Sequence, residues 1–545
     1  MLDVLLVGAE ELENLGTRYL AAVLRQHGYT VELAPFSTAG DMDAVVRRAQ
    51  LTRPRLLGLS IIFQYRAPEF LELASELRHV LPEAHITAGG HFPTFAASDL
   101  LRDHPALDSV VCGEGEFTLL ELVQRLDSPE AWHTILGLSF RRDGRVAENP
   151  PRPLIADLDS LPFPARDTPP QHHLGIGFSP VVGSRGCYRD CAFCSIRSFY
   201  GASRGKIQRF RSVPNLVDEM EMLYHTFGVR FFIFNDDEWF PAGKTRLARV
   251  TALDGELKRR GLDVIMSIKC RADDVTEDLF RRLLDVGVVR AYVGVESGSD
   301  HSLQTLNKRT TVAQNRQALE VLHKVGMLAD FGLIFFDPES TAEDIRANLN
   351  FFHDMAGEGQ APLSFGRMEV YAGTPILDRL QSEGRLTGNY LAWNYTIPDP
   401  RVEMLFRLMI ATMRHRHYAN DGLAKQCSIA YYELMMYKYL LKEHADPALS
   451  EQLRQIVARV NNHSLAMLEE MFDFTLHENI YDANRVNDQA AAWASHVNLF
   501  DLQMQAELMA WKAQVARSVQ EHTLARIANL GKGSLSGGGE HGTVE

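Results

Sequence analysis

The chain has 545 residues, about three to four times the length of a usual domain, so a single small module is excluded and about two to four domains are predicted. Hydrophobic residues make up 46% of the chain and charged residues 23%, a globular composition that excludes a disordered or fibrous protein. The formal charge of -14 argues against a general nucleic-acid binder, because phosphate neutralisation needs a basic surface.

The sequence predicts neither a membrane-spanning segment nor an exported protein. No apolar run reaches the roughly 18 residues that a membrane helix needs. The first 16 residues lack a basic leader and are typical of a first strand rather than a signal peptide. Six cysteines in a chain of this length form no disulfide framework, so we expect a cytoplasmic protein.

Residues 1–140 alternate short apolar strands with helices. Expected strands cover 4–7, 30–33, 56–62, 84–88 and 110–112, and the first helix covers 19–27 and ends at Gly28. This alternation predicts a parallel, doubly wound α/β sheet of the flavodoxin-like or Rossmann-like kind. Ligands bind such sheets at the carboxyl ends of the strands.

The next two segments are a linker and a second strand–helix alternation. Residues 141–172 are rich in Pro and Asp and have no sustained period, as in a linker. Residues 173–385 carry six expected strands with helical stretches between most of them, at 178–182, 231–234, 264–268, 291–295, 330–336 and 367–371. Six β/α units predict a partial (β/α)6 barrel.

Residues 386–530 are expected to form a helical C-terminal domain that caps the barrel mouth and selects the substrate. Within it one stripe recurs at helical spacing: Tyr432, Met435, Met436, Tyr439 and Leu440. Core packing is the favoured interpretation of this stripe, and a flexible substrate wall is the alternative. Residues 531–545 are rich in glycine and are expected to be disordered.

Cys187, Cys191 and Cys194 lie in a C-x3-C-x2-C segment just after the first barrel strand. Three thiolates on one loop can bind three irons of a cubane cluster and leave the fourth iron open. Zinc is the competing interpretation, but structural zinc needs a fourth ligand nearby. The next histidines, His172 and His173, lie upstream across a strand. Incidental buried cysteines are a further alternative.

Polar residues recur at the ends of the following barrel strands, where barrel active sites form. Asp236 and Asp237 follow the second strand, Arg271 ends the third and Glu296 ends the fourth. Taken singly, each has an ordinary structural explanation, such as a helix N-cap at Asp236 or Asp237. Taken in order, they point to one site.

These motifs together resemble the radical S-adenosylmethionine (SAM) superfamily. The resemblance implies that the three cysteines bind a 4Fe–4S cluster whose open iron chelates the amine and carboxylate of SAM. It further implies that Asp236 or Asp237 meets the SAM amine, Arg271 its carboxylate and Glu296 its ribose or methionine portion, with Phe193 and Ile334 near the adenine. The fifth strand departs from the family pattern, because Phe336 stands where a second glycine is usual.

The first domain resembles the cobalamin-binding domain through its segments 11–16, 60–62 and 89–90. Glu13 stands where the family's cobalt-binding histidine would fall, and Glu11 where its aspartate would, so no lower histidine ligand is expected. Segments 91–94 and 113–116 also look like motifs of the cobalamin-dependent radical SAM subfamily. A relic flavodoxin-like domain that merely packs on the barrel is the alternative. The resemblance implies these cobalamin contacts: Glu13, Asn14, Leu15, Gly16, Ser60, Ile62, Phe63, Gln64, Tyr65, Gly89, Gly90, His91, Glu114 and Gly115.

By this resemblance we expect a cobalamin-dependent radical SAM enzyme, most simply a C-methyltransferase. It would act on an unactivated carbon of a small-molecule or natural-product substrate, through a 5′-deoxyadenosyl radical and methylcobalamin. The implied cofactors are the 4Fe–4S cluster, SAM and cobalamin. The implied partners are a small-molecule substrate and an external electron donor of flavodoxin or ferredoxin type, with no nucleic acid and no membrane.

Several alternatives to methyl transfer stay open. Cyclisation or ring rearrangement could use the same cofactors, and the chain could be a radical SAM enzyme without cobalamin or a non-enzymatic cobalamin sensor. Methylthiolation is disfavoured, because only Cys112 lies upstream of the cysteine loop. Packing is the favoured interpretation of Tyr371, at the end of the sixth strand, and a hydrogen-atom donor or substrate contact is the alternative.

Overall fold

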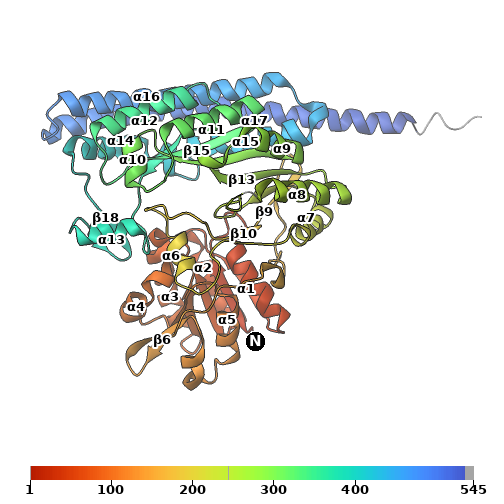
Figure 1. Ribbon diagram of the computed structural model, residues 1–545, viewed down its shortest axis with the longest axis vertical. Helices are drawn as coiled ribbons and strands as arrows, with labels where there is room; N and C mark the ends of the chain where they lie inside the picture. The colour runs from red at the N-terminus through yellow and green to blue at the C-terminus, as the bar shows by residue number, and fades with distance from the viewer. Residues whose placement is uncertain (1, 244, 534–545) are drawn as a thin grey trace, which may run out of the picture.

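The computed structural model describes residues 2–243 and 245–533 and arranges them in three stacked parts (Figure 1). An α/β domain lies at one end, a barrel-like α/β region in the middle and a layer of long helices at the other end. The chain passes through these parts in that order, as the sequence predicts.

The first domain is a sheet of strand order β2-β1-β3-β4-β5-β6-β7. Strands β1 to β5 are parallel, and all but the edge strand β2 are largely buried, which explains their nearly continuous apolar sequence. The strands are β1 (Val4–Gly8), β2 (Val31–Pro35), β3 (Leu56–Ser60), β4 (His85–Gly89), β5 (Ser109–Val111), β6 (Leu138–Arg142) and β7 (Arg145–Glu148). The helices are α1 (Leu15–Gln26), α2 (Met42–Thr52), α3 (Ala67–Val80), α4 (His91–Asp103) and α5 (Glu116–Gln124).

Two boundaries of this domain differ from the expected ones. Helix α1 begins at Leu15, because Asn14 caps it by accepting a hydrogen bond from the Thr17 amide at 3.3 Å. Residues 141–148, expected to open the linker, instead complete an antiparallel hairpin at the sheet edge. Asp143 and Gly144 have φ angles of 51° and 74°, as a tight two-residue hairpin turn requires. The irregular connection therefore begins after Glu148.

The second region is a half-barrel sheet of order β16-β15-β14-β13-β12-β9-β8. Six strands are parallel, and β8 is an antiparallel edge. The strands are β8 (Gln171–His173), β9 (Ile176–Val181), β12 (Val229–Phe234), β13 (Ile265–Arg271), β14 (Val288–Glu296), β15 (Leu328–Phe336) and β16 (Ser364–Arg367). The helices are α6 (Ile196–Gly201), α7 (Val213–Phe227), α8 (Arg246–Arg260), α9 (Glu277–Val286), α10 (Asp300–Thr305), α11 (Val312–Val325), α12 (Ala342–Ala356) and α13 (Pro375–Ser382). Two small ribbons pair β10 (Ser184–Arg185) with β11 (Arg209–Phe210), and β17 (Thr387–Asn389) with β18 (Ala392–Asn394).

The sixth barrel strand was placed wrongly by the sequence pattern, at 367–371. Strand β16 ends at Arg367, whose partner is Phe336, the last residue of β15. Beyond Arg367 there is no neighbouring strand left to pair with, so Tyr371 falls in a loop.

Four long helices form the last layer: α14 (Pro400–Tyr418), α15 (Leu423–Leu440), α16 (Pro447–His477) and α17 (Ala483–Gly533). They are not an independent cap, because Leu405 of α14 and Leu465 of α16 belong to the same hydrophobic core as the barrel. Residues 531–533, expected to begin the disordered tail, are helical, and the rest of that expected tail lies outside the described residues.

Helix α15 closes the end of the barrel where the strands begin, rather than the expected mouth. Its Met435, Met436 and Leu440 pack against Ile176 and Ile265, the first residues of β9 and β13. Core packing therefore explains much of the expected Met and Tyr stripe. Tyr432 and Met436 also line a cavity, so for these two residues the substrate wall stays a prediction.

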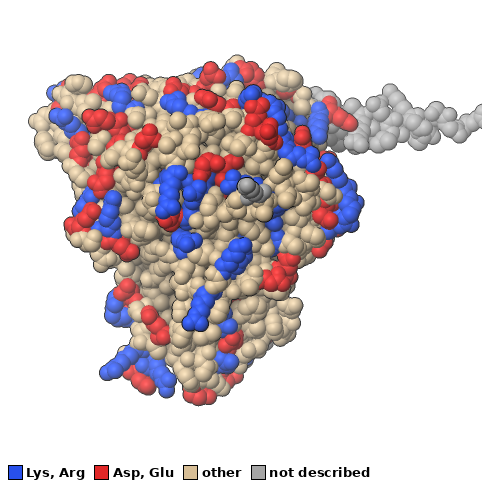
Figure 2. Space-filling model, viewed as in Figure 1, with Lys and Arg blue, Asp and Glu red and all other residues tan. Residues whose placement is uncertain are grey.

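The surface carries interspersed charges of both signs on the face seen in Figure 2. Within residues 2–243 and 245–533, we find no helix that combines the length and the apolar character that crossing a membrane requires.

Candidate active site

A cavity of about 1060 Å³ is lined by both α/β regions. Its first wall comes from the loops after β1, β3, β4 and β5, at the carboxyl edge of the first sheet, where doubly wound sheets bind ligands. Its second wall comes from the inner face of β12, β13 and β14, and its third from α15. One space therefore connects the sheet edge of the first domain with the barrel interior.

Nearly all of the expected cobalamin contacts line this cavity. They are Glu13, Asn14, Leu15, Gly16, Ser60, Ile62, Phe63, Tyr65, Gly89, Gly90, His91, Glu114 and Gly115. Gln64 does not line the cavity. Its side chain is buried, and its Oε1 accepts a hydrogen bond from the Ala372 amide at 2.8 Å, which ties the loop after β3 to the loop after β16.

The sheet edge is shaped for close approach of a ligand. Gly90 has a φ of 111°, and a Cβ there would lie 2.7 Å from the Ile61 carbonyl oxygen. Ile62, Phe63 and Tyr65 are 40%, 52% and 59% exposed, and the rings of Phe63 and Tyr65 stack with centroids 5.6 Å apart. An exposed apolar group inside a cavity marks a ligand-binding surface.

Two buried side-chain nitrogen atoms of this wall have no hydrogen-bond partner among the described residues. They are Nε2 of His91 and Nδ2 of Asn14. The His91 ring stacks on Phe199 of the barrel region at 4.1 Å, and burial lowers the pKa of His91 below its usual value. Buried polar groups are normally paired, so these atoms are suited to a polar ligand. The residues present therefore fit a cobalamin.

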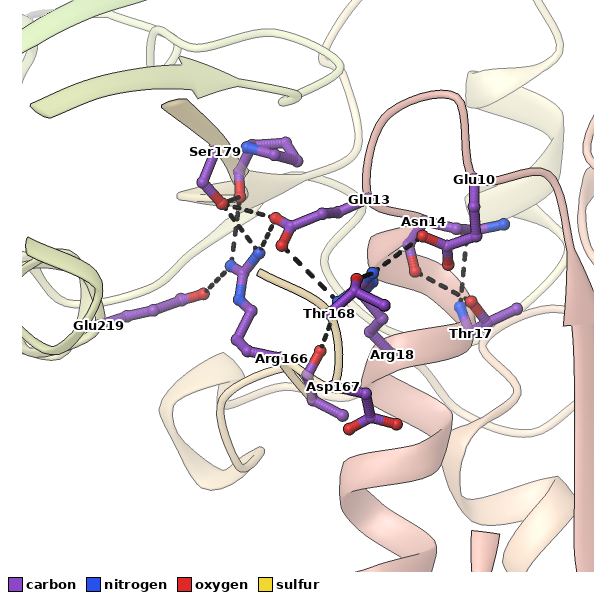
Figure 3. A network of polar contacts seen from close by, with 12 residues as sticks. Glu10, Glu13, Asn14, Thr17, Arg18, Arg166, Asp167, Thr168, Ser179 and Glu219 are labelled. Carbon is purple, nitrogen blue, oxygen red and sulfur yellow. Dashed lines mark hydrogen bonds and ion pairs between the residues drawn. The ribbon is translucent and has the colours of Figure 1, made fainter. Parts of the chain in front are cut away.

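Glu13 takes part in a buried network that joins the two regions (Figure 3). Its carboxylate pairs with Arg166 of the linker and accepts a hydrogen bond from Ser179 Oγ of β9 at 2.6 Å. Arg166 also donates to Glu219 of α7 at 2.6 Å. The Glu13 side chain, at the position where a cobalt-binding histidine would fall, is thus engaged by the barrel region.

The cysteine loop lies where the sequence predicts, after β9 and before α6. Burial raises the pKa of Cys187 to about 11 and of Cys194 to about 12, so these thiols need a bound cation to ionise at neutral pH. Among the described residues no three His, Cys, Asp or Glu side chains are grouped to hold a single metal ion. A cubane binds each cysteine through a different iron, so three thiolates on one loop fit that group.

A chain of polar contacts runs from this loop to the end of β14. Arg271 Nη1 lies 3.8 Å from Cys191 Sγ, and its Nη2 donates to the Lys308 carbonyl oxygen at 2.7 Å. Lys308 in turn donates to Glu296 at 2.8 Å. Arg271 and Glu296 are therefore brought together beside the cysteines. Lys308 was missed, because a lone lysine in a loop carries no sequence signal.

The two aspartates after β12 point to different places. Asp236 is buried and accepts hydrogen bonds from the Gly183 amide at 3.0 Å and Ser184 Oγ at 2.5 Å. Burial raises the pKa of Asp236 to about 6. Asp236 thus braces the chain ahead of the cysteine loop, and the expectation that it meets SAM is not supported. Asp237 lines the cavity and accepts from the Gly186 amide at 2.8 Å.

The remaining expected residues lie away from the cavity lining. Phe193 and Ile334 are half-buried and pack against the barrel core. Tyr371 does not line the cavity, and its hydroxyl donates to Glu369 instead. Its expected catalytic role depended on the misplaced sixth strand. Tyr292, near the centre of β14, does line the cavity. The alternation of side chains along β14 could have indicated that Tyr292 faces the barrel interior.

Glu114 connects the first domain to the cysteine region. It accepts hydrogen bonds from Arg185 at 2.9 Å and Arg209 at 2.8 Å, and Arg185 also pairs with Glu116 at 2.6 Å. Burial alone would raise the pKa of Glu114, but the two guanidinium groups outweigh it and lower that pKa.

Comparisons with known proteins agree with this architecture. Residues 1–123 match the model of the B12 binding domain, and residues 181–352 match that of the radical SAM superfamily. An uncharacterized methyltransferase of Pyrococcus horikoshii is 27% identical over 440 residues, which cover 79% of this chain and 89% of that protein. An anaerobic magnesium-protoporphyrin IX monomethyl ester cyclase of Rubrivivax gelatinosus is 28% identical, over 67% of this chain and 65% of that protein.

A solved structure shares the fold of the whole chain. The cobalamin-dependent SAM radical enzyme OxsB with aqua-cobalamin bound superposes with a TM-score of 0.65 and 19% identity, over 96% of this chain and 81% of that one. The fold and the site define an enzyme in which a B12-binding domain faces a radical SAM half-barrel. The chain belongs to the cobalamin-dependent radical SAM enzymes.

Proposed function

We propose that this protein is a C-methyltransferase that moves a methyl group from SAM, by way of cobalamin, to an unactivated carbon of a small molecule. The single observation that carries the proposal is the shared cavity. The apolar loop after β3 and the inner faces of β12 to β14 line the same space. A corrin on the first wall and a substrate in the barrel would therefore be neighbours.

When bound, the cluster and SAM supply a 5′-deoxyadenosyl radical and cobalamin supplies the methyl group. We assign Cys187, Cys191 and Cys194 as the cluster ligands. Arg271 lies beside Cys191 and is placed to receive a carboxylate from SAM. Asp237 lines the cavity and is the better candidate of the two aspartates for the SAM amine. Lys308 fixes Glu296 at the end of β14 and so positions it.

On the first wall, Ile62, Phe63 and Tyr65 would lie against the lower face of the corrin and shield it from water. His91 and Asn14 offer unpaired polar atoms to the amide groups or the nucleotide tail of cobalamin. Gly90 lets that tail pass close to the backbone after β3. These assignments leave cobalt without a side-chain ligand from position 13, because Glu13 is held by Arg166.

The reaction also needs electrons from outside the chain. We propose an electron donor of flavodoxin or ferredoxin type and a cytoplasmic setting. The six cysteines are all free, which suits a reducing compartment.

The proposal is tested with the anaerobically reconstituted enzyme, excess reductant and SAM labelled in its methyl group. We expect label on the protein-bound cobalamin and S-adenosylhomocysteine as coproduct, before any substrate is added. Label that stays on SAM while 5′-deoxyadenosine accumulates would instead favour cyclisation or rearrangement. The likeness to the Rubrivivax gelatinosus cyclase makes that outcome the specific alternative.

A further inference from the structure

Two lysines from separate elements line the barrel part of the cavity. Lys269 lies on β13, where it alternates with Ile268 and Cys270, which pack into the barrel core on the other face of the strand. Lys425 lies on the first turn of α15 and shares one helix face with Ile429, Tyr432 and Met436. Both lysine side chains are exposed.

These two lysines differ from the other cationic side chains around them. Arg290 of β14 is paired with Asp330, and His173 of β8 lies 3.3 Å from Glu433. Within the part of the chain that the structure describes, neither Lys269 nor Lys425 makes an ion pair or a side-chain hydrogen bond. The barrel part of the cavity therefore carries two uncompensated positive charges.

The walls around these charges are largely apolar. Phe178 of β9 and Phe231 and Ile233 of β12 line the same space. An anion attracted into such a space is less screened than one at an open surface, because the local dielectric constant is lower than that of water. A ligand with an apolar body and one anionic group matches this lining.

Lys269 is set apart from the cluster side of the barrel. Arg271, two residues further along β13, is the residue in contact with Cys191. Two residues of strand separate them by roughly 7 Å, with Lys269 nearer the α15 end. The carboxylate of SAM would meet Arg271 first, which leaves Lys269 and Lys425 for a second anion.

We propose that Lys269 and Lys425 bind an anionic group, a phosphate or a carboxylate, on the substrate. That the bound anion belongs to the substrate rests on the proposed function. It narrows the substrate class to small molecules that combine an apolar part with at least one acidic group. Neutral hydrocarbons and cationic substrates are excluded by the same charges.

The test uses the holoenzyme, reconstituted with cluster and cobalamin and saturated with SAM in the absence of reductant, so that no turnover occurs. Calorimetric titrations compare 1-naphthyl phosphate, 1-naphthoate and neutral 1-naphthol, which share an apolar body. The variants are Lys269→Met and Lys425→Met. The matched control is Lys442→Met, because Lys442 is an exposed lysine outside the cavity.

We expect at least one of the two anions to bind about tenfold or more tightly than naphthol. Each cavity variant should weaken that anion about tenfold and leave naphthol unchanged, whereas Lys442→Met should change neither. Whichever anion binds more tightly indicates whether the substrate carries a phosphate or a carboxylate. Equal affinity for anions and naphthol, no binding of either anion, or no loss in Lys269→Met would overturn the proposal.

Two further readouts keep this result separate from neighbouring claims. If Lys269→Met weakens SAM binding rather than naphthyl anion binding, Lys269 belongs to the SAM site and the proposal is wrong. Iron and cobalamin contents equal to those of Lys442→Met show that the variants are folded. Failure to label cobalamin from SAM would refute the proposed methyl transfer without altering the binding result.

Discussion

Glu13 and Arg166 form a buried ion pair that joins the loop after β1 to the linker ahead of the barrel. Their side chains are 10% and 4% exposed, and Ser179 of β9 donates to the same carboxylate. Glu13 stands where cobalamin domains would have their cobalt-binding histidine. Here this residue instead helps to hold the two domains together. The apolar loop of Ile62, Phe63 and Tyr65 is the part of the wall that would face a bound cobalamin.

The first prediction concerns the coordination of cobalt. Position 13 holds a glutamate, whose Oε2 is engaged by Arg166 and Ser179, and not a histidine, so we expect no nitrogen ligand from the protein on bound cobalamin. Electron paramagnetic resonance of the reduced cofactor should give identical spectra for enzyme made with ¹⁴N and with ¹⁵N. A change in hyperfine splitting between the two preparations would show a protein nitrogen on cobalt.

The second prediction concerns stability. Removing one partner of a buried ion pair costs about 3–5 kcal/mol when the other charge is left unpaired, and less here because Arg166 keeps Glu219 as a partner. Glu13→Ala should therefore lower the midpoint of thermal unfolding clearly. Glu32→Ala is the matched control, since the Glu32–Arg48 pair is largely exposed and exposed pairs contribute less than about 1 kcal/mol. Equal shifts in the two variants would contradict a stabilising role for the domain contact.

The third prediction concerns pH. Arg185 and Arg209 hold the pKa of Glu114 below its usual value of 4.5. A carboxyl whose pKa is lower in the folded state stabilises that state fully above its unfolded pKa, and this contribution is lost as the pH falls through the folded pKa. Glu114→Gln should lower the thermal midpoint of the apoprotein at pH 7, and the difference from the parent should shrink below about pH 4.5. A difference independent of pH would show that charge is not the cause.

The fourth prediction concerns Gly90. A Cβ at this position would approach the Ile61 carbonyl oxygen to 2.7 Å in a backbone conformation that glycine favours. We expect Gly90→Ala to weaken cobalamin binding at least about tenfold, measured by retention after desalting. Gly144→Ala, at another positive φ but with nothing within 4 Å of its Cβ, should retain cobalamin. Equal retention in both variants would remove Gly90 from the binding site.

The fifth prediction concerns the cysteine loop. Cys191→Ala removes one of three cluster ligands, so bound iron and both SAM-derived products should be lost. Cys427→Ala is the control, because Cys427 is buried among the C-terminal helices. A fully active Cys191→Ala enzyme would contradict the assignment of Cys191 as a cluster ligand.

The domain order and most strands could be predicted from the sequence, because parallel strands buried on both faces give distinct apolar runs. The β6–β7 hairpin was missed, since its strands are short and lie at the sheet edge. The sixth barrel strand was displaced, because the apolar Met368 and Val370 extend the pattern beyond Arg367 although no partner strand continues. Strand pairing, not composition, decides where an edge strand ends.

The site was predicted best where a motif is local. The cysteine loop follows the end of β9, and Gly89 and Gly90 lie at the end of β4, so the pattern fixes their place. The direction of a side chain is not local, and Asp236 and Asp237 illustrate this. They are adjacent in sequence, but Asp236 accepts from the Gly183 amide and the Ser184 hydroxyl, whereas Asp237 faces the cavity. Arg166, Lys308 and Lys269 were beyond sequence analysis, because their importance comes from partners distant in the chain.

The most direct test of the whole account is the iron and cobalamin content of the protein after anaerobic reconstitution and desalting. The account predicts about four irons and about one cobalamin per chain. Iron retained without cobalamin would contradict it, because the first domain would then be a relic that packs on the barrel and methyl transfer through cobalt would be impossible.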